Sequence, residues 1–362
     1  METPSLDDKF TVRTRASRPP RGVSILPSVG EYPIYDEAIY RVLRDDTRRN
    51  DLFSRAVRAA APGATVLEIG SGPDLLWSLA AADAGAARVY AVEVIPASAR
   101  QAEKVARAQA AGRVCVIAGD ATKIALPERA DMCIAEIVGC IGGAEGIAAV
   151  IADARRRHLT PSAPVIPAAV RTMAGVVGLL DLTGSDVAMT PDMVPYTEAV
   201  FRQAGAPFDL RLYVAGAGPG ALLSTTGPFE TLDLDRQSCT QGGSLRVEIT
   251  RSGLADGLLA WIELKVGPDD GLLDSLAEDT NWLPVYIPFA GHGPLPVSPG
   301  DVLSLDVTVS TADGIHPEYF FSGHLARGGS AVEVSAESRY SGGPFRSTAV
   351  HRILFPAQPP AS

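Results

Sequence analysis

The sequence predicts two domains, an α/β domain followed by a domain of antiparallel strands. Three observations support this prediction. Between residues 65 and 158, short apolar runs alternate with segments of helical periodicity, which is typical of βαβ units and a parallel sheet. After Pro167 strands dominate, and several alternate apolar with polar residues, as in Leu305–Val309. The length of 362 residues also suits two domains.

The first domain is expected to open with a helical region over Asp36–Ala61, which Pro62 and Gly63 terminate. The strands that we expect after it are Thr65–Ile69, Arg88–Val94, Val114–Ala118 and Asp131–Glu136. The helices that we expect between and after them are Leu75–Ala82, Pro96–Ala111 and Gly146–His158. Ligands of such parallel sheets bind beyond the carboxyl ends of the strands.

The second domain is expected to be an antiparallel sandwich or barrel. Its predicted strands are Ser244–Ser252, Leu258–Val266, Leu303–Thr311, Ser330–Ser335 and Ser347–Phe355. The stretch Gly184–Leu223 has mixed character and is interpreted as an excursion from the barrel. The predicted division is therefore a flexible N-terminal segment (1–30), the α/β domain (31–167), the β domain (168–356) and a short tail (357–362).

Composition excludes several classes of function. Hydrophobic residues make up 46% and charged residues 20%, an ordinary globular balance. The net charge of −10 disfavours nucleic-acid binding, which depends on basic side chains. The four cysteines form no C-x-x-C pair and the five histidines show no metal-like spacing, so we expect no metal. No signal-like segment or apolar run of 18 residues occurs, so the expectation is a cytoplasmic protein without membrane association.

A glycine turn follows the first predicted strand, in Glu68-Ile69-Gly70-Ser71-Gly72. Glu93 closes the next strand, 23 residues after Gly70, where a carboxylate can accept hydrogen bonds from ribose hydroxyls. Asp74 would repel a pyrophosphate but suits a cationic ligand, which favours S-adenosyl-L-methionine over a dinucleotide. Gly119-Asp120-Ala121, after the third strand, is placed to meet the adenine.

Two glutamates flank an apolar, glycine-rich loop after the fourth strand. Glu136 ends that strand, the loop Ile137–Ala144 carries no charge, and Glu145 follows it. Carboxylates in apolar surroundings are costly without a cationic partner. A planar guanidinium, which carboxylates can bind with two parallel hydrogen bonds, is the natural partner.

At these residues the sequence resembles the protein arginine methyltransferase family. The two family glutamates, nine residues apart, match Glu136 and Glu145, which the resemblance makes the catalytic pair. Leu43–Arg48 is similar to the family's M-L-x-D-x-x-R helix, so Arg48 is expected to bind the methionyl carboxylate. Glu68, Gly70, Gly72, Glu93, Asp120 and Ala121 are the other expected cofactor residues. Thr280-Asn281-Trp282 matches the family's T-H-W, so Asn281 and Trp282 are expected substrate residues, and Tyr35 matches its aromatic cluster loosely.

The resemblance also implies an architecture. It consists of a Rossmann-like class I methyltransferase domain, an antiparallel β-barrel domain, and an inserted arm through which family members form dimers. The stretch Gly184–Leu223 fits that arm, so a homodimer is expected.

The sequence departs from the family at several positions. Asp74 replaces the third glycine of the cofactor loop, and Asn281 replaces a histidine. The loop Ile137–Ala144 lacks the usual aromatic residues and, with its three glycines, is predicted to be smaller and more flexible. These features suggest the bacterial branch that methylates free L-arginine in streptozotocin-type natural-product biosynthesis. The alternatives are methylation of arginine residues in a protein, methylation of another amine, and a catalytically silent dimeric scaffold.

Overall fold

The computed structural model describes residues 24–28, 37–110, 112–183, 211–236, 238–268, 270–291, 293–311, 313–339 and 353–354. Tyr35 and most of the predicted arm (184–210) lie outside these residues, as does most of the predicted strand Ser347–Phe355. Residues 353–354 are helical, so that strand prediction is wrong at those two positions. None of the described helices has the length and apolarity that crossing a bilayer requires.

The first domain contains a five-stranded parallel sheet with the order β4-β3-β2-β5-β6. The strands are β2 (Thr65–Ile69), β3 (Arg88–Glu93), β4 (Val114–Ala118), β5 (Met132–Ala135) and β6 (Val165–Ile166). The first four were all predicted from their apolar runs, with ends that differ by one residue at most. β2 lies in the middle of the sheet: β3 and β4 are added on one side of it, and β5 and β6 on the other. This switch point is where such sheets bind ligands.

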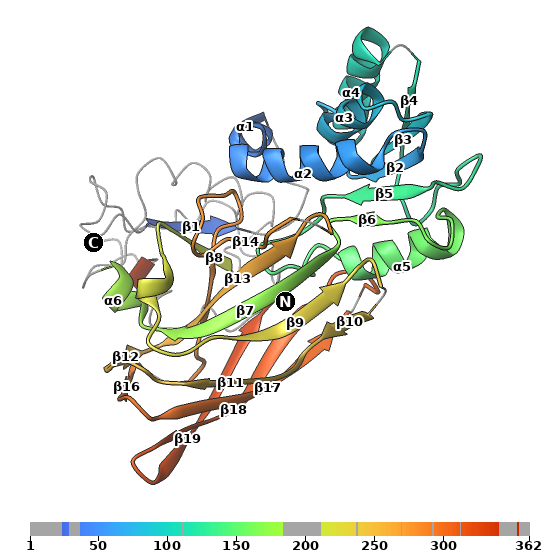
Figure 1. Ribbon diagram of the computed structural model, residues 1–362. Helices are drawn as coiled ribbons and strands as arrows, with labels where there is room; N and C mark the ends of the chain where they lie inside the picture. Colours follow the sequence, from blue (N-terminus) through green and yellow to red (C-terminus); the bar gives the residue numbers. More distant parts are fainter. Residues whose placement is uncertain are drawn as a thin grey trace, which may run out of the picture.

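Helices cover both faces of this sheet (Figure 1). They are α1 (Glu37–Asp45), α2 (Thr47–Ala60), α3 (Leu76–Asp83), α4 (Pro96–Gln109) and α5 (Ile147–Arg157). Helices α2, α3 and α4 lie on one side, and α5 lies on the side that faces the second domain. Asp46 separates α1 from α2, because its carboxylate caps α2 by accepting a hydrogen bond from the Arg49 N–H at 2.8 Å.

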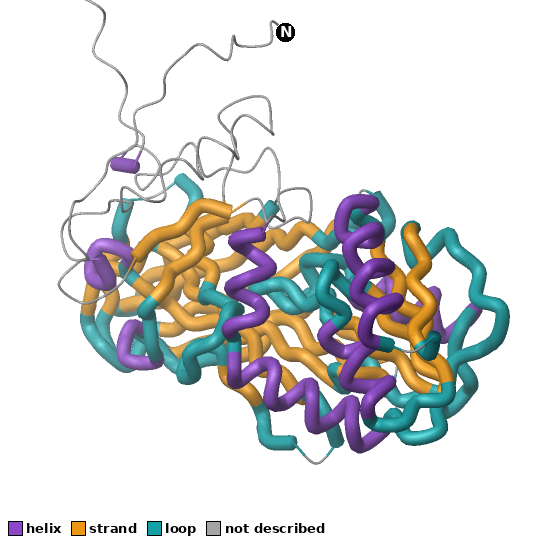
Figure 2. Tube along the Cα trace, turned by 90° about the horizontal axis from the view of Figure 1, so that it is seen from above, coloured by secondary structure: helices purple, strands orange, loops and turns teal. Residues whose placement is uncertain are grey.

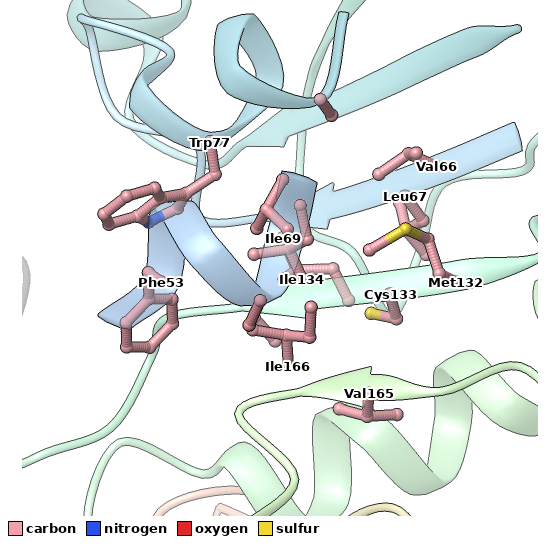
Figure 3. Packing of buried hydrophobic residues seen from close by; sticks show 14 of the residues in the cluster. Phe53, Val66, Leu67, Ile69, Trp77, Met132, Cys133, Ile134, Val165 and Ile166 are labelled. Atoms are coloured by element: carbon pink, nitrogen blue, oxygen red, sulfur yellow. The ribbon is translucent and has the colours of Figure 1, made fainter. Parts of the chain in front are cut away.

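The core of the first domain forms between α2, α3 and the sheet (Figure 3). Phe53 of α2 stacks on Trp77 of α3, with ring centroids 5.1 Å apart. Ile69 and Ile134 extend this layer along β2 and β5. The same cluster continues into the second domain through Ile262 and Leu264, so the two domains share an apolar interface.

The second domain consists of antiparallel sheets. The largest has the order β1-β8-β15-β13-β7-β9-β10, with β14 beside β13. Its strands are β1 (Ser24–Ser28), β7 (Ala169–Val177), β8 (Arg211–Ala215), β9 (Gly227–Asp233), β10 (Ser238–Gln241), β13 (Gly257–Lys265), β14 (Leu273–Asp274) and β15 (Val285–Pro288). The other strands are β11 (Gly243–Glu248), β12 (Gly253–Ala255), β16 (Leu295–Val297), β17 (Val302–Ser310), β18 (Glu318–Arg327) and β19 (Ser330–Ser338). Its described residues also include the short helices α6 (Leu179–Thr183) and η2 (Pro219–Ala221).

The second domain is barrel-like because its sheets enclose one apolar cluster. The second sheet has the order β11-β17-β18-β19, and a bridge between Phe289 and Ala336 links it to the region of β15. Seen from above, most helices gather over one half of the molecule, and the strands of the second domain extend into the other half (Figure 2). The predicted architecture of a Rossmann-like domain and a barrel-like domain is therefore confirmed.

Two described segments differ from the sequence expectations. β1 lies inside the segment predicted to be flexible, yet its five residues pair with β8. β8 lies inside the stretch predicted to be the arm, yet it joins the largest sheet between β1 and β15. Pairing with β1 and β15 satisfies backbone N–H and C=O groups along β8, and this pairing explains why both segments form strands of the sheet.

Candidate active site

The glycine turn after β2 is shaped by close packing. Gly70 and Gly72 both have positive φ, 74° and 64°, which favours glycine. A Cβ atom on Gly70 would also lie 2.9 Å from the Ile137 side chain. The N–H groups of Gly70 and Ser71 donate to the Val92 carbonyl at 2.9 and 3.1 Å, so the turn is fixed to β3. The result is a tightly held backbone turn at the switch point of the sheet, with Gly70 exposed.

Glu93 stands at the carboxyl end of β3 and is buried. Its carboxylate accepts hydrogen bonds from the Gly72 N–H at 2.8 Å and from the Ile95 N–H at 2.7 Å. Burial raises the pKa of Glu93, and these two hydrogen bonds oppose that rise. Glu93 therefore fixes the glycine turn to the end of β3.

Glu68 lies beneath the turn and is fully buried on β2. It accepts a hydrogen bond from the Ser78 hydroxyl of α3, while its Oε1 atom has no partner among the described residues. Burial raises the pKa of Glu68 to about 8, and Glu93 and Glu136 add to the rise. At neutral pH Glu68 is therefore mostly a neutral carboxylic acid.

Helix α1 is fastened over the glycine turn. The Arg44 guanidinium of α1 forms an ion pair with Asp74 at 2.6 Å. The Tyr40 hydroxyl lies 3.1 Å from the Ser98 hydroxyl of α4, and its ring lies 3.6 Å from where a Gly72 Cβ would be. Asp74, the departure from the family's third glycine, thus holds α1 in place.

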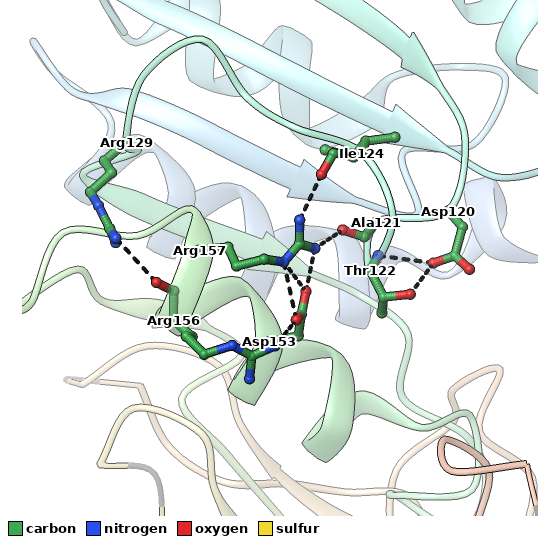
Figure 4. Close-up of polar contacts among 8 residues, drawn as sticks. All are labelled: Asp120, Ala121, Thr122, Ile124, Arg129, Asp153, Arg156 and Arg157. Carbon is green, nitrogen blue, oxygen red and sulfur yellow. Dashed lines mark hydrogen bonds and ion pairs between the residues drawn. The ribbon is translucent and has the colours of Figure 1, made fainter.

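The turn after β4 is also held firmly (Figure 4). The Asp120 carboxylate accepts hydrogen bonds from the Thr122 N–H at 2.9 Å and its hydroxyl at 2.7 Å. The Arg157 guanidinium at the end of α5 donates to the carbonyls of Ala121 at 2.8 Å and Ile124 at 2.6 Å. Asp153, one helical turn earlier, forms an ion pair with Arg157 and so aims it at this turn.

Glu136 follows β5 and forms a buried ion pair with Arg49 of α2. Burial raises the pKa of Glu136, and the Arg49 charge opposes that rise. Arg49 is 3% exposed and lies over the rings of Trp77 and Trp282, at 5.2 and 6.0 Å from their centroids. Its Nε atom is buried and has no hydrogen-bond partner among the described residues.

Arg48, the arginine that the family motif indicates, has a different partner from Arg49. It forms an ion pair with Glu278 of the second domain, and both side chains are about one-third exposed. This ion pair does not test the cofactor-binding role expected for Arg48. The signal that points to Arg49 is the duplication in Asp45-Asp46-Thr47-Arg48-Arg49, because the D-x-x-R spacing fits Asp46 and Arg49 equally well.

The second domain also contacts this region through Asn281 and Trp282. The Asn281 N–H donates to the Asp46 carboxylate at 2.7 Å, and the Trp282 indole N–H donates to the Val138 carbonyl at 2.8 Å. Trp282 is buried, and the Asn281 Oδ1 atom is buried without a partner among the described residues. Within the described ranges, no group of three His, Cys, Asp or Glu side chains is suited to a metal.

The loop between the two glutamates is buried, in contrast to the predicted flexibility. Val138, Gly139 and residues 141–144 are all buried, and Ile141 and Ala144 belong to the apolar cluster of the barrel-like domain. The prediction of a flexible loop is therefore wrong, because its glycines allow close packing against the second domain. Glu145, at the end of the loop, is half-buried and directly precedes the first turn of α5.

These features define the class of the protein. A nucleoside suits the three features at neighbouring strand ends. They are the glycine turn after β2, the acid Glu93 at the end of β3 and the hydrogen-bonded turn after β4. The Nε atom of the buried Arg49, which has no partner among the described residues, suits a carboxylate on that ligand. The chain has the site of a Rossmann-like S-adenosylmethionine-dependent methyltransferase.

Comparison with known proteins identifies the family. The sequence model of the family described as "PRMT5 arginine-N-methyltransferase" matches residues 28–165. The arginine N(omega)-methyltransferase of Streptomyces achromogenes subsp. streptozoticus is 30% identical over 280 residues, which cover 72% of this chain and 73% of the relative. The chain therefore belongs to the arginine methyltransferase family and is an S-adenosylmethionine-dependent arginine N-methyltransferase.

Solved structures agree on the fold. The crystal structure of Arabidopsis thaliana protein arginine methyltransferase 10 has a TM-score of 0.66 and 20% sequence identity, covering 83% of this chain and 97% of that one. The Trypanosoma brucei PRMT1 enzyme–prozyme complex with AdoHcy has a TM-score of 0.64 and 17% identity, covering 86% of this chain and 100% of that one. Both likenesses extend over the two domains.

Proposed function

We propose that this enzyme methylates a terminal guanidino nitrogen of free L-arginine. The observation that carries the proposal is the loop Ile137–Ala144, which has no aromatic side chain and is packed into the barrel-like domain between Glu136 and Glu145. A small, held loop suits a small substrate. The similarity to a relative named arginine N(omega)-methyltransferase, spread over 73% of that relative, supports the same reading.

In this proposal Glu136 and Glu145 bind the substrate guanidinium. A guanidinium has a pKa above about 12 and is a poor nucleophile in its fully charged, solvated state. Two carboxylates in a site from which water is excluded concentrate electron density on one nitrogen and aim it. Positioning of this kind supplies roughly 7–11 kcal/mol of barrier reduction. The cofactor, when bound, supplies the methyl group as a sulfonium substituent.

The proposed cofactor residues come from three strand ends and from α2. They are Glu68, Gly70, Gly72, Glu93, Asp120 and Ala121, together with an arginine of α2. For the methionyl carboxylate we propose Arg49 in preference to Arg48, the arginine that the family motif indicates. Arg49 is buried and its Nε has no partner within the described residues, whereas Arg48 is partly exposed and paired with Glu278. Because Arg49 also contacts Glu136, it would link the cofactor to a carboxylate of the enzyme that binds the substrate.

The proposed substrate residues beyond the glutamates are Asn281, Trp282 and Tyr35. The buried, unpaired Oδ1 of Asn281 suits an N–H donor of the substrate. Trp282 would wall the site, because its indole is fixed to Val138 in the loop between the glutamates. An Asn at this position cannot act as a base, so we assign it hydrogen bonding alone. Tyr35 remains a proposal from sequence, since it lies outside the described residues.

Incubation with methyl-labelled S-adenosylmethionine tests the substrate. Free L-arginine and an Arg/Gly-rich peptide are supplied separately, and the products are identified by mass. The proposal predicts label on free arginine at a terminal nitrogen. Label on the peptide alone would instead support the second candidate, an enzyme acting on protein arginine, which the names of the solved relatives favour. Adding D-arginine as a control measures how strongly the α-carbon substituents are recognised.

The finer sequence expectations belong to this proposal as well. We propose that the second domain closes as a barrel, that Gly184–Leu223 includes a dimerisation arm, and that the enzyme is a cytoplasmic homodimer in a natural-product pathway. The family resemblance supports the dimer, and the acidic composition is consistent with a protein that does not bind nucleic acid. Light scattering after gel filtration measures the dimer directly.

A further inference from the structure

A buried carboxylate of the barrel-like domain contacts the loop between the two active-site glutamates. Glu230 on β9 is 1% exposed and accepts four hydrogen bonds. The donors are the Gly143 N–H at 2.9 Å, the Thr172 hydroxyl at 2.6 Å, the Tyr319 hydroxyl at 2.6 Å and the Gln241 amide at 3.0 Å. These groups come from the loop and from β7, β18 and β10, so Glu230 joins four segments.

Two of these four hydrogen bonds connect Glu230 with consecutive backbone N–H groups of the loop. The Gly143 N–H donates to Glu230 directly. The Gly142 N–H donates to the Thr172 hydroxyl at 2.9 Å, and that hydroxyl donates its own hydrogen to Glu230. Glu230 therefore binds Gly143 directly and Gly142 through Thr172.

The loop can approach the barrel this closely only because it contains glycine. A Cβ atom on Gly143 would lie 2.6 Å from the Gln241 amide nitrogen and would also clash with Glu230. A Cβ atom on Gly142 would lie 2.7 Å from the Val170 side chain. The departure from the family's aromatic loop is thus matched to a carboxylate on the neighbouring domain.

The contact is transmitted to Glu145 by short turns. The Ala144 N–H donates to the Ile141 carbonyl at 2.9 Å, and the Gly146 N–H donates to the Gly143 carbonyl at 2.8 Å. Glu145 lies between these two bonded residues, two positions after Gly143. Movement of Gly143 would therefore displace the backbone of Glu145.

Burying a charge for stability alone is costly, because an apolar group of similar volume often stabilises a core as well or better. The four converging donors to Glu230 offset that cost. What an apolar residue could not do is bind the N–H groups of the loop.

We propose that Glu230 is a positioning residue for the substrate guanidinium. By holding Gly142 and Gly143, it sets where Glu145 stands relative to Glu136. This inference rests on the proposed role of Glu136 and Glu145 in binding the guanidinium. It adds a specificity-determining contact from the second domain, which links folding of the barrel to recognition of the substrate.

The test compares Glu230→Ala with Glu230→Gln and with a control variant. Glu230→Ala should reduce kcat/KM for the arginine substrate at least tenfold and leave the Kd for S-adenosylhomocysteine within about twofold. Glu230→Gln should keep most of the activity that Glu230→Ala loses, because its amide oxygen can accept from Gly143 and Thr172. Its amide nitrogen can donate to the Tyr319 hydroxyl and, once the Gln241 amide rotates, to the Gln241 oxygen. Phe321→Leu is the control, since this buried ring packs on Phe229 in the same core and has no polar group that could hydrogen-bond to the loop.

Hydrogen exchange adds a readout that does not depend on turnover. The peptide covering residues 137–146 should lose protection in Glu230→Ala but keep it in Phe321→Leu. If Glu230→Ala does not fold, Thr172→Val replaces it, because this variant removes the acceptor for the Gly142 N–H and one donor to Glu230 but keeps the bond from Gly143 to Glu230. Loss of activity no greater than in Phe321→Leu, or unchanged protection of the loop, would overturn the inference. Absence of arginine turnover by the unmodified enzyme would count against the proposed function instead.

Discussion

Two glycine-containing loops meet in the active site, and they are held in different ways. The cofactor turn Gly70–Gly72 is bonded to Val92 and Glu93 of its own domain. The loop Ile137–Ala144 is bonded to Thr172, Glu230 and Trp282 of the other domain. The two loops touch, since a Cβ on Gly70 would lie 2.9 Å from Ile137. In the proposed assignment, the cofactor residues therefore belong to one domain, whereas the substrate residues come from both.

Substitutions at the glutamate loop should separate substrate methylation from cofactor binding most strongly. Glu136→Gln should lower kcat for arginine methylation by two or more orders of magnitude, because the neutral amide cannot bind and polarise a guanidinium as a carboxylate does. The Kd for S-adenosylhomocysteine should remain the same or fall, since Arg49 keeps its charge. Steady-state kinetics and calorimetry measure the two quantities. A parallel loss of affinity and activity would show that the loops are not separable.

The two neighbouring arginines of α2 provide the second contrast. Arg49→Ala should weaken S-adenosylhomocysteine binding by about 10- to 100-fold, the cost of losing a charge-assisted hydrogen bond in a buried site. Arg48→Ala should weaken it by less than about threefold, because Arg48 is paired with Glu278 at a partly exposed position. Calorimetric titration of both variants decides between them. The reverse order of effects would restore Arg48 as the carboxylate ligand.

The pH dependence of stability tests the buried acid beneath the cofactor turn. Because the pKa of Glu68 is raised from 4.5 to about 8, its protonated form stabilises the fold fully below pH 4.5, and that stability is lost as the pH rises towards 8. Glu68→Gln does not titrate, so its Tm relative to the unmodified protein should rise by a few degrees between pH 5 and 8. Thermal melts across this range measure it. A difference in Tm that is independent of pH would contradict the assignment.

The smallest effect is expected at the ion pair that fastens α1. Asp74→Asn should weaken cofactor binding by no more than about fivefold, since partly exposed ion pairs contribute about 0.2–1 kcal/mol. The effect should shrink as salt is added, because the pair is screened. Arg44→Gln is the matched variant, and the double variant should be no weaker than either single one. Additive losses would mean that the two side chains act independently.

The sequence predicts the elements around the glycine turn well because their contacts are local. Gly70, Gly72 and Glu93 lie at the ends of adjacent apolar runs, and parallel strands bring such ends together. Their contacts are set within about 25 residues of chain. Periodicity and turn residues are sufficient to find elements of this kind.

The substrate half could not be predicted in the same way. Glu230 and Thr172 lie on strands β9 and β7, and nothing in their local sequence connects them with Gly142 or Gly143. The sequence pattern therefore suggested a flexible loop, whereas packing across the domain interface makes it a held one. The sequence motif indicated Arg48, and the case for Arg49 comes only from the fold, in which the cap at Asp46 sets the start of α2.

The most direct measurement is a crystal structure of the enzyme with S-adenosylhomocysteine and L-arginine. The account predicts that carboxylate oxygens of both Glu136 and Glu145 lie within hydrogen-bond distance of the guanidinium, and that Arg49 contacts the cofactor carboxylate. A guanidinium that contacts neither glutamate, or an arginine bound away from the loop Ile137–Ala144, would contradict it.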